Sequence, residues 1–417
     1  MKKITKCLHC GKEYFDFRLK CETGCDAFLR SDYYEKNFNP GNEKSLFKFL
    51  EWLPCGHKIE TTISPIVYKS RNLAKKLGLT NLYIAFNGYW PEMGAENITG
   101  TFKDFEALPT LLNFIDQGKK RIILSSAGNT ARAFAYATTL LDFDTYIVIP
   151  GKMLHKLWLP TKKSIGRTHI ISISGSQDYY RAIQLSEKIA RECRIDPEGG
   201  AKNLARRDGL GVVMLEAARV IGKLPAQYFQ AVGSGTGAIA SYEASLRLLG
   251  DKKFQGQHPP KLNLVQNEPF TPIYNAWKTN TPIQPDINME TQLNQIDNMW
   301  SEVLANRNPP FNIKGGVGDV LKLTGGVVHC VNNDEAIAAS KEFEELEGID
   351  IEPAASVCAA ALKKAVLRQS VDKEEIILLN ITGGGLKKLE RDYDCFQLEP
   401  EFVVDDDLNF DWIKNLF

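Results

Sequence analysis

Lys103 occupies a position in the chain that favours covalent chemistry. It ends the run Thr99-Gly-Thr101-Phe102-Lys103, where a loop is expected to become a helix. Thr101 or Thr99 could cap that helix, and Phe102 could pack back onto its first turn. The amino end of a helix is partly positive, so it disfavours the ammonium form of a lysine placed there. A neutral lysine amine can attack an aldehyde, although most lysines at helix starts are solvated surface residues.

A second candidate segment is the run SSAGNT at residues 125–130, which follows an expected strand and opens an expected helix. Ligands of open α/β sheets bind at the carboxyl ends of strands, where backbone N–H groups and a helix amino end converge. Asn129 could donate a hydrogen bond to a phenolic ring oxygen without adding charge. The alternative is an ordinary Gly-Asn turn.

A third segment, Gly233-Ser234-Gly235-Thr236-Gly237, also lies between an expected strand and an expected helix. Its three glycines let the backbone turn its amides onto an anion, and the two hydroxyls add donors. The helix that follows points its positive end at the same place. No Gly-Lys-Ser/Thr follows, so this is not a Walker loop. A phosphate site is favoured over a plain structural turn.

A fourth segment, NITGGGLK at residues 380–387, ends a strand in glycines. Thr382 offers a neutral hydroxyl, which suits a pyridine nitrogen that stays unprotonated. An aspartate there would protonate the ring and deepen its capacity to take up electrons. A hydroxyl therefore suits β-elimination and β-replacement, although a glycine-rich turn that only ends the strand is the alternative. Together the four segments predict a site for pyridoxal 5'-phosphate.

A positively charged run, PEGGAKNLARRDG at residues 197–209, precedes a further expected helix. Arg206 and Arg207 lie beside Asn203 and Lys202, and a guanidinium can bind an oxyanion through two parallel hydrogen bonds. The alternative is a solvated cluster of charges. With a second anion to bind, we favour a substrate site.

The N-terminal segment carries four cysteines in two pairs, Cys7 with Cys10 and Cys21 with Cys25. Two such pairs can close a tetrahedral zinc site on a small ribbon that is too short to bury its own core. Four cysteine ligands would leave no open position, so such a zinc would be structural. The second pair has three intervening residues rather than two, so its spacing is less specific for zinc than that of the first.

Residue 61 onward alternates short apolar runs with helical patterns, which predicts mostly parallel sheets covered on both faces. The stretch 267–330, rich in Asn, Pro and Gly, is expected to be irregular and to wrap the active-site side. The expected strands are 82–86, 121–125, 145–150, 169–173, 228–232, 261–266 and 376–380, and the expected helices are 68–77, 104–117, 129–141, 177–192, 210–221, 237–249 and 353–368.

The bulk properties are those of a globular enzyme. The chain has 417 residues, 43% of them hydrophobic, which suggests two lobes and an appendage rather than one core. Its 51 basic and 51 acidic residues cancel, so no net field attracts nucleic acid or an anionic membrane. The start MKKITKCLHC lacks the apolar core of a signal peptide, and no apolar run is long enough to span a bilayer. We expect a cytoplasmic enzyme.

These segments, in this order, resemble the fold-type II pyridoxal-phosphate enzymes, most closely the threonine synthase group. The run TGTFKD is similar to that group's cofactor-lysine motif, SSAGNT to its asparagine loop, and ITGGGLK to its ring-nitrogen motif. The N-terminal Cys-x-x-Cys-Gly-x-x-Tyr segment is similar to the start of archaeal-type threonine synthases. Within the group the chain is most similar to the cysteate synthases, on runs such as YIAFNGYWPE, KLWLP, PEGGAKNLARRDG and LLNITGGGLKK. Lys103 is followed by Asp-Phe-Glu rather than the Asp-Arg-Gly common in threonine synthases.

The resemblance implies a tryptophan synthase β-like fold with two open, mostly parallel α/β domains and an N-terminal Cys-rich ribbon. The expected division is 1–60 for the ribbon, 61–94 with 198–417 for the large domain that binds the cofactor, and 95–197 for the small domain. A homodimer is also implied, because fold-type II enzymes commonly pair.

The activity implied by the resemblance is a β-replacement that converts O-phospho-L-serine and sulfite to L-cysteate and phosphate. Lys103 would hold the cofactor and move the Cα proton, and Arg206, with Asn203 and Arg207, would bind the substrate phosphate. Thr130 would bind the amino-acid carboxylate.

Three alternatives remain open. A threonine synthase would act on O-phosphohomoserine and water, and one methylene changes pocket discrimination by only ~1–3 kcal/mol. Use of O-acetylserine and sulfide is disfavoured by the arginine-rich run. A non-catalytic module could use the cysteine ribbon to bind a partner, although the balanced charge argues against nucleic acid. Whether the product would serve coenzyme M or sulfonolipid synthesis is not indicated.

Overall fold

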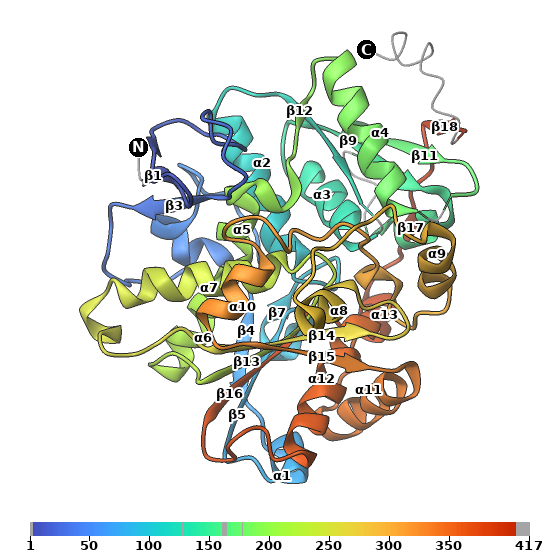
Figure 1. Ribbon diagram of the computed structural model, residues 1–417. Coiled ribbons are helices and arrows are strands. Elements are labelled where there is room, and N and C mark those ends of the chain that lie inside the picture. The colour runs from blue at the N-terminus through green and yellow to red at the C-terminus, as the bar shows by residue number, and fades with distance from the viewer. Residues whose placement is uncertain (1–2, 127, 161–164, 177, 406–417) are drawn as a thin grey trace.

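The structure is a computed structural model that describes residues 3–126, 128–160, 165–176 and 178–405. Two β-sheets form its framework, a five-stranded sheet in the upper part of Figure 1 and a six-stranded sheet in the lower part. Both sheets are mostly parallel and are covered by helices, so the predicted α/β class is confirmed. No helix among the described residues is both long and apolar enough to cross a bilayer.

The six-stranded sheet has the order β15-β14-β13-β16-β5-β4, and all neighbours are parallel except β4 and β5. Helix α12 packs across β13, β14, β15 and β16, and α11 packs on α12. The strands are β4 (Ile66–Lys69), β5 (Asn81–Phe86), β13 (Gln227–Ala231), β14 (Lys261–Asn267), β15 (Val327–Val331) and β16 (Ile376–Ile381).

The five-stranded sheet is parallel throughout and has the order β12-β8-β9-β11-β18. Helix α4 packs on β8 and β9. Strand β18 comes from residues 402–404, which were expected in the large domain, and it pairs with β11. The predicted domain boundaries stay a prediction. The strands are β8 (Arg121–Ser125), β9 (Asp144–Pro150), β11 (Thr168–Ile173), β12 (Asp196–Pro197) and β18 (Phe402–Val404).

The helices that surround the sheets bring distant parts of the chain together, because α2 packs against both α3 and α5, and α5 packs against α7. The α-helices are α1 (Asn72–Leu77), α2 (Lys103–Asp116), α3 (Asn129–Thr139), α4 (Tyr179–Glu192), α5 (Leu204–Leu210), α6 (Val212–Ile221), α7 (Thr236–Leu249), α8 (Pro272–Thr279), α9 (Met289–Asp297), α10 (Val317–Leu323), α11 (Asn333–Glu347), α12 (Pro353–Leu367) and α13 (Leu386–Asp392). The 3-10 helices are η1 (Leu46–Trp52), η2 (Pro91–Met93), η3 (Gly151–Lys156), η4 (Ile165–Arg167), η5 (Gly200–Lys202), η6 (Lys252–Phe254) and η7 (Glu302–Leu304), and the short strands are β6 (Tyr89–Trp90), β7 (Ala95–Glu96), β10 (Trp158–Leu159) and β17 (Phe396–Gln397).

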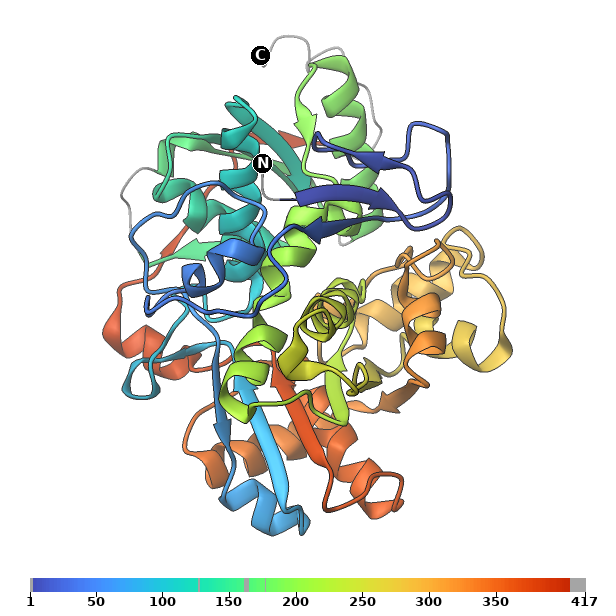
Figure 2. The ribbon, with the colours of Figure 1, turned by 90° about the vertical axis from the view of Figure 1, so that its left-hand side faces the viewer.

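The N-terminal segment forms a three-stranded antiparallel sheet, which in Figure 2 lies at the same end of the molecule as the five-stranded sheet. Its strand β3 is tied to α5 by two hydrogen bonds to Asp208, from the Ser31 hydroxyl (2.6 Å) and from the Tyr33 hydroxyl (2.8 Å). Arg247 of α7 also donates to this buried carboxylate, at 2.6 Å. The strands are β1 (Lys3–Cys7), β2 (Glu13–Tyr14) and β3 (Leu29–Tyr33).

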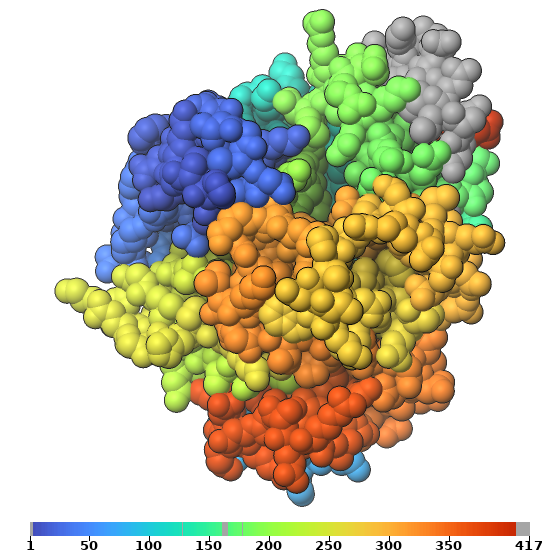
Figure 3. Space-filling view, viewed as in Figure 1, coloured from blue at the N-terminus to red at the C-terminus, as the bar shows by residue number. Residues whose placement is uncertain are grey.

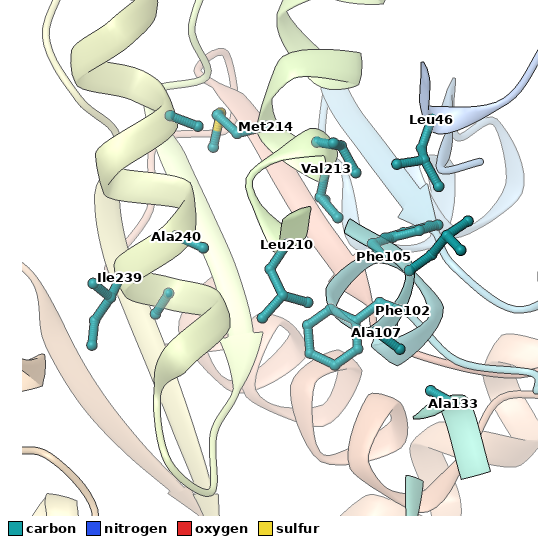
Figure 4. Packing of buried hydrophobic residues seen from close by; sticks show 14 of the residues in the cluster. Leu46, Phe102, Phe105, Ala107, Ala133, Leu210, Val213, Met214, Ile239 and Ala240 are labelled. Carbon is teal, nitrogen blue, oxygen red and sulfur yellow. The ribbon is translucent and has the colours of Figure 1, made fainter. Parts of the chain in front are cut away.

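The start of α2 is anchored in the main hydrophobic core. Figure 4 shows Phe102 and Phe105 packed toward Leu210 and Val213, which come from α5 and α6. Phe105 and Val213 are buried almost completely, as is Leu210. Because these side chains are closely packed, the start of α2 is held in one position, and so is its first residue, Lys103.

Two expectations about secondary structure are wrong. Residues 68–77 were expected as one helix, but Tyr68 and Lys69 belong to β4 and pair with β5, which leaves α1 only six residues. The β-branched pair Ile66-Val67 favours that strand.

The stretch 267–330 is not irregular, because it contains α8, α9, α10 and most of β15. In α9 only Ile296 is buried, so the sequence shows little helical periodicity there. This stretch runs across the middle of the face seen in Figure 3, and Lys314 forms a backbone bridge with Ala27 of the N-terminal segment. Two residues of predicted segments, Ala127 and Gln177, lie outside the described residues.

Candidate active site

Lys103 is the first residue of α2. The Thr101 side chain accepts a hydrogen bond from the Lys103 backbone N–H (3.3 Å), but the residue at the cap position is Phe102, so the expected threonine cap is not formed. Thr99 does not cap the helix, because its hydroxyl and its backbone N–H both donate to Asp104, at 2.6 and 3.3 Å. The loop before the lysine is therefore fixed from both sides of residue 103.

The amino group of Lys103 lies against one carboxylate. Its Nζ is 3.1 Å from Glu106 Oε2, one helical turn along α2, and 19% of the lysine side chain is exposed. Burial lowers the pKa of Lys103, the negative charge of Glu106 raises it, and the nearby Arg206 cation lowers it. The expected lowering is present, but its largest cause is burial rather than the helix dipole.

Glu106 joins the lysine to two other elements. Its Oε1 accepts a hydrogen bond from the hydroxyl of Thr130 at 2.8 Å, at the start of α3, and lies 3.4 Å from Nη1 of Arg206 on α5. The carboxylate is completely buried. Glu106 was not predicted as a site residue, although its three-residue separation from Lys103 places both side chains on one face of a helix.

Arg206 is buried beside this carboxylate and is held by a second one. Its Nε donates to Glu198 Oε1 at 3.0 Å, and its Nη2 donates to Glu198 Oε2. Asn203 caps α5 by accepting from the Ala205 N–H (2.8 Å), and its amide donates to the Glu198 carbonyl (2.7 Å). Asn203 thus holds the loop that orients Arg206, and both ends of its side chain are occupied.

Arg207 is not brought to this cluster. Its guanidinium is completely buried on the other side of α5, where Nε donates to Glu243 at 2.9 Å and the two terminal nitrogens donate to the carbonyls of Ala201 and Leu29. The Leu29 carbonyl belongs to strand β3, so Arg207 ties α5 to the N-terminal ribbon.

Asn129, the first residue of α3, lies beside a buried carboxylate that was not predicted from the sequence. Its amide donates to Glu352 Oε2 at 3.0 Å, while its oxygen accepts from Arg132 at 3.2 Å. Arg132 also forms an ion pair with Glu352 at 3.3 Å. Burial raises the pKa of Glu352, and the charge of Arg132 opposes that rise.

The glycine-rich turn after β16 pairs directly with the lysine loop. The Phe102 N–H donates to the Thr382 carbonyl at 2.9 Å, and the Gly384 N–H donates to the Gly100 carbonyl at 3.0 Å. A Cβ at Gly383 would lie 2.7 Å from the Gly100 carbonyl oxygen, which only a glycine avoids. The Thr382 side chain is buried and donates no hydrogen bond to any residue that the structure describes, so it can face a ligand.

The predicted phosphate loop, residues 233–237, connects β13 to α7 and lies against the residue before the lysine. A Cβ at Gly237 would be 2.9 Å from the Phe102 ring, and Gly235 has a φ of +75°, which favours glycine. The hydroxyls of Ser234 and Thr236 are 2.7 Å apart. A helix start with two hydroxyls and close-packed glycines is a fitting phosphate site.

The lysine start of α2 thus contacts both the Thr382 turn and the phosphate loop, and it shares Glu106 with α3, which begins at Asn129. An aldehyde-binding amine, a hydroxyl that can face a ring nitrogen, an amide and a phosphate site are the groups that pyridoxal phosphate requires. The residues present fit this cofactor.

The four N-terminal cysteines also come together. The sulfur atoms of Cys7, Cys10, Cys21 and Cys25 all lie within 4.8 Å of one another, and Cys10 Sγ and Cys21 Sγ are 3.7 Å apart. Such a spacing suits ligands on the corners of a tetrahedron about a zinc ion. Gly11, with a φ of +75°, makes the tight turn after the first pair.

Comparisons with known proteins agree with this geometry. A family described as "Pyridoxal-phosphate dependent enzyme" matches residues 64–383. Among solved structures, a pyridoxal 5'-phosphate-dependent aspartate racemase superposes with a TM-score of 0.59 at 17% identity, covering 78% of this chain and 92% of that one. Maize serine racemase gives a TM-score of 0.57 at 18% identity, covering 79% and 91%. The similarity to these two structures shows the fold alone.

Curated relatives define the group more narrowly. The cysteate synthase of Methanosarcina acetivorans is 49% identical over 403 residues, which is 96% of each chain. That of Methanosarcina mazei is 48% identical over 96% of each chain, and that of Methanocella paludicola is 45% identical over 92% of this chain and 90% of its own. The chain belongs to the pyridoxal-phosphate-dependent enzymes and, within them, to the cysteate synthase family.

The buried Asp104 makes the stability of the site depend on pH. Burial raises the pKa of Asp104 to about 7, from 3.8 in an exposed aspartate, despite the bonds from Thr99. Between about pH 4 and about pH 7 the folded protein therefore keeps a proton that the unfolded chain has lost. The free energy of unfolding is expected to fall as the pH rises through this window, by up to about 4 kcal/mol from this group.

Asp104→Asn should remove that contribution, because the amide is neutral at every pH and has nearly the same shape. The measurement is urea denaturation of both proteins at several pH values across the window. Equal pH slopes for the two proteins would contradict the assignment to Asp104.

Proposed function

We propose that the protein replaces the phosphate of O-phospho-L-serine with sulfite, which gives L-cysteate and phosphate. The observation that carries this proposal is the buried arginine Arg206 beside Lys103, which offers an oxyanion site next to the amine that would hold the cofactor. The relatives named cysteate synthase support the same reaction.

Pyridoxal phosphate, when bound, withdraws electrons from Cα of an amino acid and so makes the Cα proton removable. We assign its attachment to Lys103. Gly233, Ser234, Gly235, Thr236 and Gly237 would hold its phosphate, and two further residues would hold its ring. Asn129 would donate to the ring oxygen, and the neutral Thr382 hydroxyl would face the ring nitrogen and leave it unprotonated.

The reaction itself asks three things of the chain. The Lys103 amine takes the proton from Cα and later returns it. Arg206 binds the substrate phosphate and could then receive sulfite, because both are oxyanions. Glu198 occupies the Nε and Nη2 edge of that guanidinium, and Nη1 forms an ion pair with Glu106 Oε1 at 3.4 Å, so an anion would bind on the Nη1 edge beside Glu106. Thr130 binds the amino-acid carboxylate through its backbone N–H, because its hydroxyl donates to Glu106.

The substrate is tested by assaying the cofactor-loaded protein with one amino acid at a time. We expect L-cysteate and phosphate from O-phosphoserine and sulfite, and much slower release of phosphate from O-phosphohomoserine. Threonine as the main product, from O-phosphohomoserine and water, would contradict the proposal and indicate a threonine synthase. Preference for O-acetylserine and sulfide would contradict the role given to Arg206.

Arg206 and Arg207 form a matched pair for testing the anion site. Arg206→Lys keeps the charge but loses the planar fork, so the KM for O-phosphoserine should rise about 10- to 100-fold, as expected for a charged hydrogen bond of ~1.5–3 kcal/mol. Arg207→Lys is the same change on the next residue, where the side chain contacts Glu243 and the ribbon instead. It should lower the thermal stability and leave KM nearly unchanged. Equal KM values for Arg206→Lys and the wild type would remove Arg206 from the site.

We further propose that Cys7, Cys10, Cys21 and Cys25 bind a structural zinc ion. The N-terminal ribbon has only a small hydrophobic core of its own, and a bound metal ion would supply the stability that this core lacks. The ribbon in turn supports α5 through Asp208 and Arg207, the two residues that follow Arg206.

Metal analysis of the purified protein should give about one zinc per chain, because four cysteines complete one tetrahedral site. Cys21→Ser should lose the metal and lower the thermal stability. Cys395→Ser changes an exposed cysteine outside the cluster and should keep the metal. Zinc retained equally by both variants, or absent from the wild type, would contradict the zinc site.

The remaining proposals rest on the class of enzyme. The partners are small molecules, O-phosphoserine and sulfite, without nucleic acid or membrane. We propose a cytoplasmic homodimer by analogy with the fold-type II enzymes, which commonly pair.

A further inference from the structure

We propose that Glu106 is a second catalytic residue, whose carboxylate holds the ammonium form of Lys103 between the removal of the Cα proton and its return. This inference rests on the proposed β-replacement and deepens it. Glu106 touches the reacting nitrogen itself, since Oε2 is 3.1 Å from Lys103 Nζ.

The carboxylate is held in place by groups on three elements. Thr130 of α3 donates to Oε1 at 2.8 Å, Arg206 of α5 places Nη1 3.4 Å from the same oxygen, and Glu106 itself stands on α2 with Lys103. Its side chain is completely buried. A carboxylate with both oxygens engaged and no access to solvent is pre-organised, so it need not reorient when the charge on the lysine changes.

Glu106 remains ionised in this setting. Burial would raise the pKa of Glu106, but the charges of Arg206 and Lys103 and the hydrogen bond from Thr130 together lower it. It therefore acts as a fixed negative charge and not as the base. The base is the lysine, whose affinity for a proton is weakened by burial and by Arg206 and strengthened by Glu106.

The other ionisable groups that face this pair are few among the described residues. Glu198, which precedes α5, contributes a more distant negative charge and is paired with Arg206. Tyr179 of α4 lies near Arg206 and Glu106, and burial raises the pKa of its phenol, so it stays neutral. Of these groups only Glu106 is in hydrogen-bond contact with the lysine nitrogen.

The balance of the reaction shows why this contact matters. The Cα–H and Cβ–O bonds break and the Cβ–S and a new Cα–H bond form, while the Cβ–O electron pair leaves with phosphate and the sulfur lone pair of sulfite makes the new bond. No oxidant or reductant is needed. One proton leaves Cα and one returns, and while it is away it resides on Lys103, where a buried cation needs a partner. Glu106 supplies that partner.

The test measures the pKa of the Lys103 amine in the cofactor-free protein, without any amino-acid substrate. Pyridoxal phosphate attaches only to the neutral amine, so the rate of attachment rises with pH through the pKa of Lys103. Visible absorbance monitors this rate. In Glu106→Gln the midpoint of this rise should move to lower pH by at least about one unit, because the charge that favours the ammonium is gone. Lys103→Ala should show no attachment band.

Glu198→Gln is the matched control. This variant removes the buried carboxylate that pairs with Arg206, but it leaves the contact between Glu106 and Lys103 intact. Its midpoint should therefore move much less than that of Glu106→Gln. Equal midpoints for the wild type and Glu106→Gln, or an equal shift in both variants, would overturn the proposal.

Two further measurements separate catalysis from structure. In the loaded enzyme, Glu106→Gln should lower kcat about 10- to 100-fold with a smaller change in KM, as for loss of a group that acts during proton transfer. Glu106→Asp keeps the charge and carries the test if the amide variant does not fold. Its midpoint should lie below that of the wild type, because the shorter side chain places the carboxylate farther from Lys103 Nζ. An unchanged midpoint would overturn the proposal. If the midpoint shifts as expected in Glu106→Gln but the wild-type protein does not act on O-phosphoserine, the proposed substrate is wrong and the role of Glu106 beside Lys103 still holds.

Discussion

Four charged side chains in one buried cluster set the conditions for the rest of the site. Lys103 and Arg206 bring two positive charges, and Glu106 and Glu198 bring two negative ones, with Arg206 and both carboxylates buried. Removing one member would leave an uncompensated buried charge, which costs about 3–5 kcal/mol. The cluster therefore requires α2, α5 and the loop at residue 198 to keep fixed positions relative to one another.

The backbone meets that requirement in two ways. The lysine loop and the turn after β16 exchange hydrogen bonds at Phe102 and Gly384, so the two loops hold one another at the carboxyl end of the large sheet. On the far side of α5, Asp208 and Arg207 attach the helix to the N-terminal ribbon. The ribbon thus supports the helix that carries Arg206.

The parts of the site that could be predicted from the sequence are those set by local patterns. Short apolar runs between helical segments gave the parallel sheets, and glycines at strand ends marked the loops at residues 233–237 and 382–385. The spacing of four cysteines predicted their cluster, which the structure contains. The carboxylates Glu106, Glu198 and Glu352 were not identified as site residues. Glu106 lies only three residues from Lys103 and Glu198 only eight from Arg206, but the contacts of Glu106 with α3 and α5 and those of Glu352 join distant segments. Glu352, for example, meets Arg132 across 220 residues of sequence. The opposite directions of Arg206 and Arg207 likewise follow from the orientation of α5, a helix that the sequence pattern did not reveal before residue 210.

We expect pyridoxal phosphate to be held by Lys103 at the start of α2, and this attachment underlies every role proposed for the site. It is tested most directly by reducing the cofactor-loaded protein with borohydride, which fixes the cofactor to the lysine that carries it, and by mapping the labelled peptide. We expect the label on the peptide that contains Lys103 and on no other. A label on a different lysine, or a loaded protein that takes up none, would contradict it.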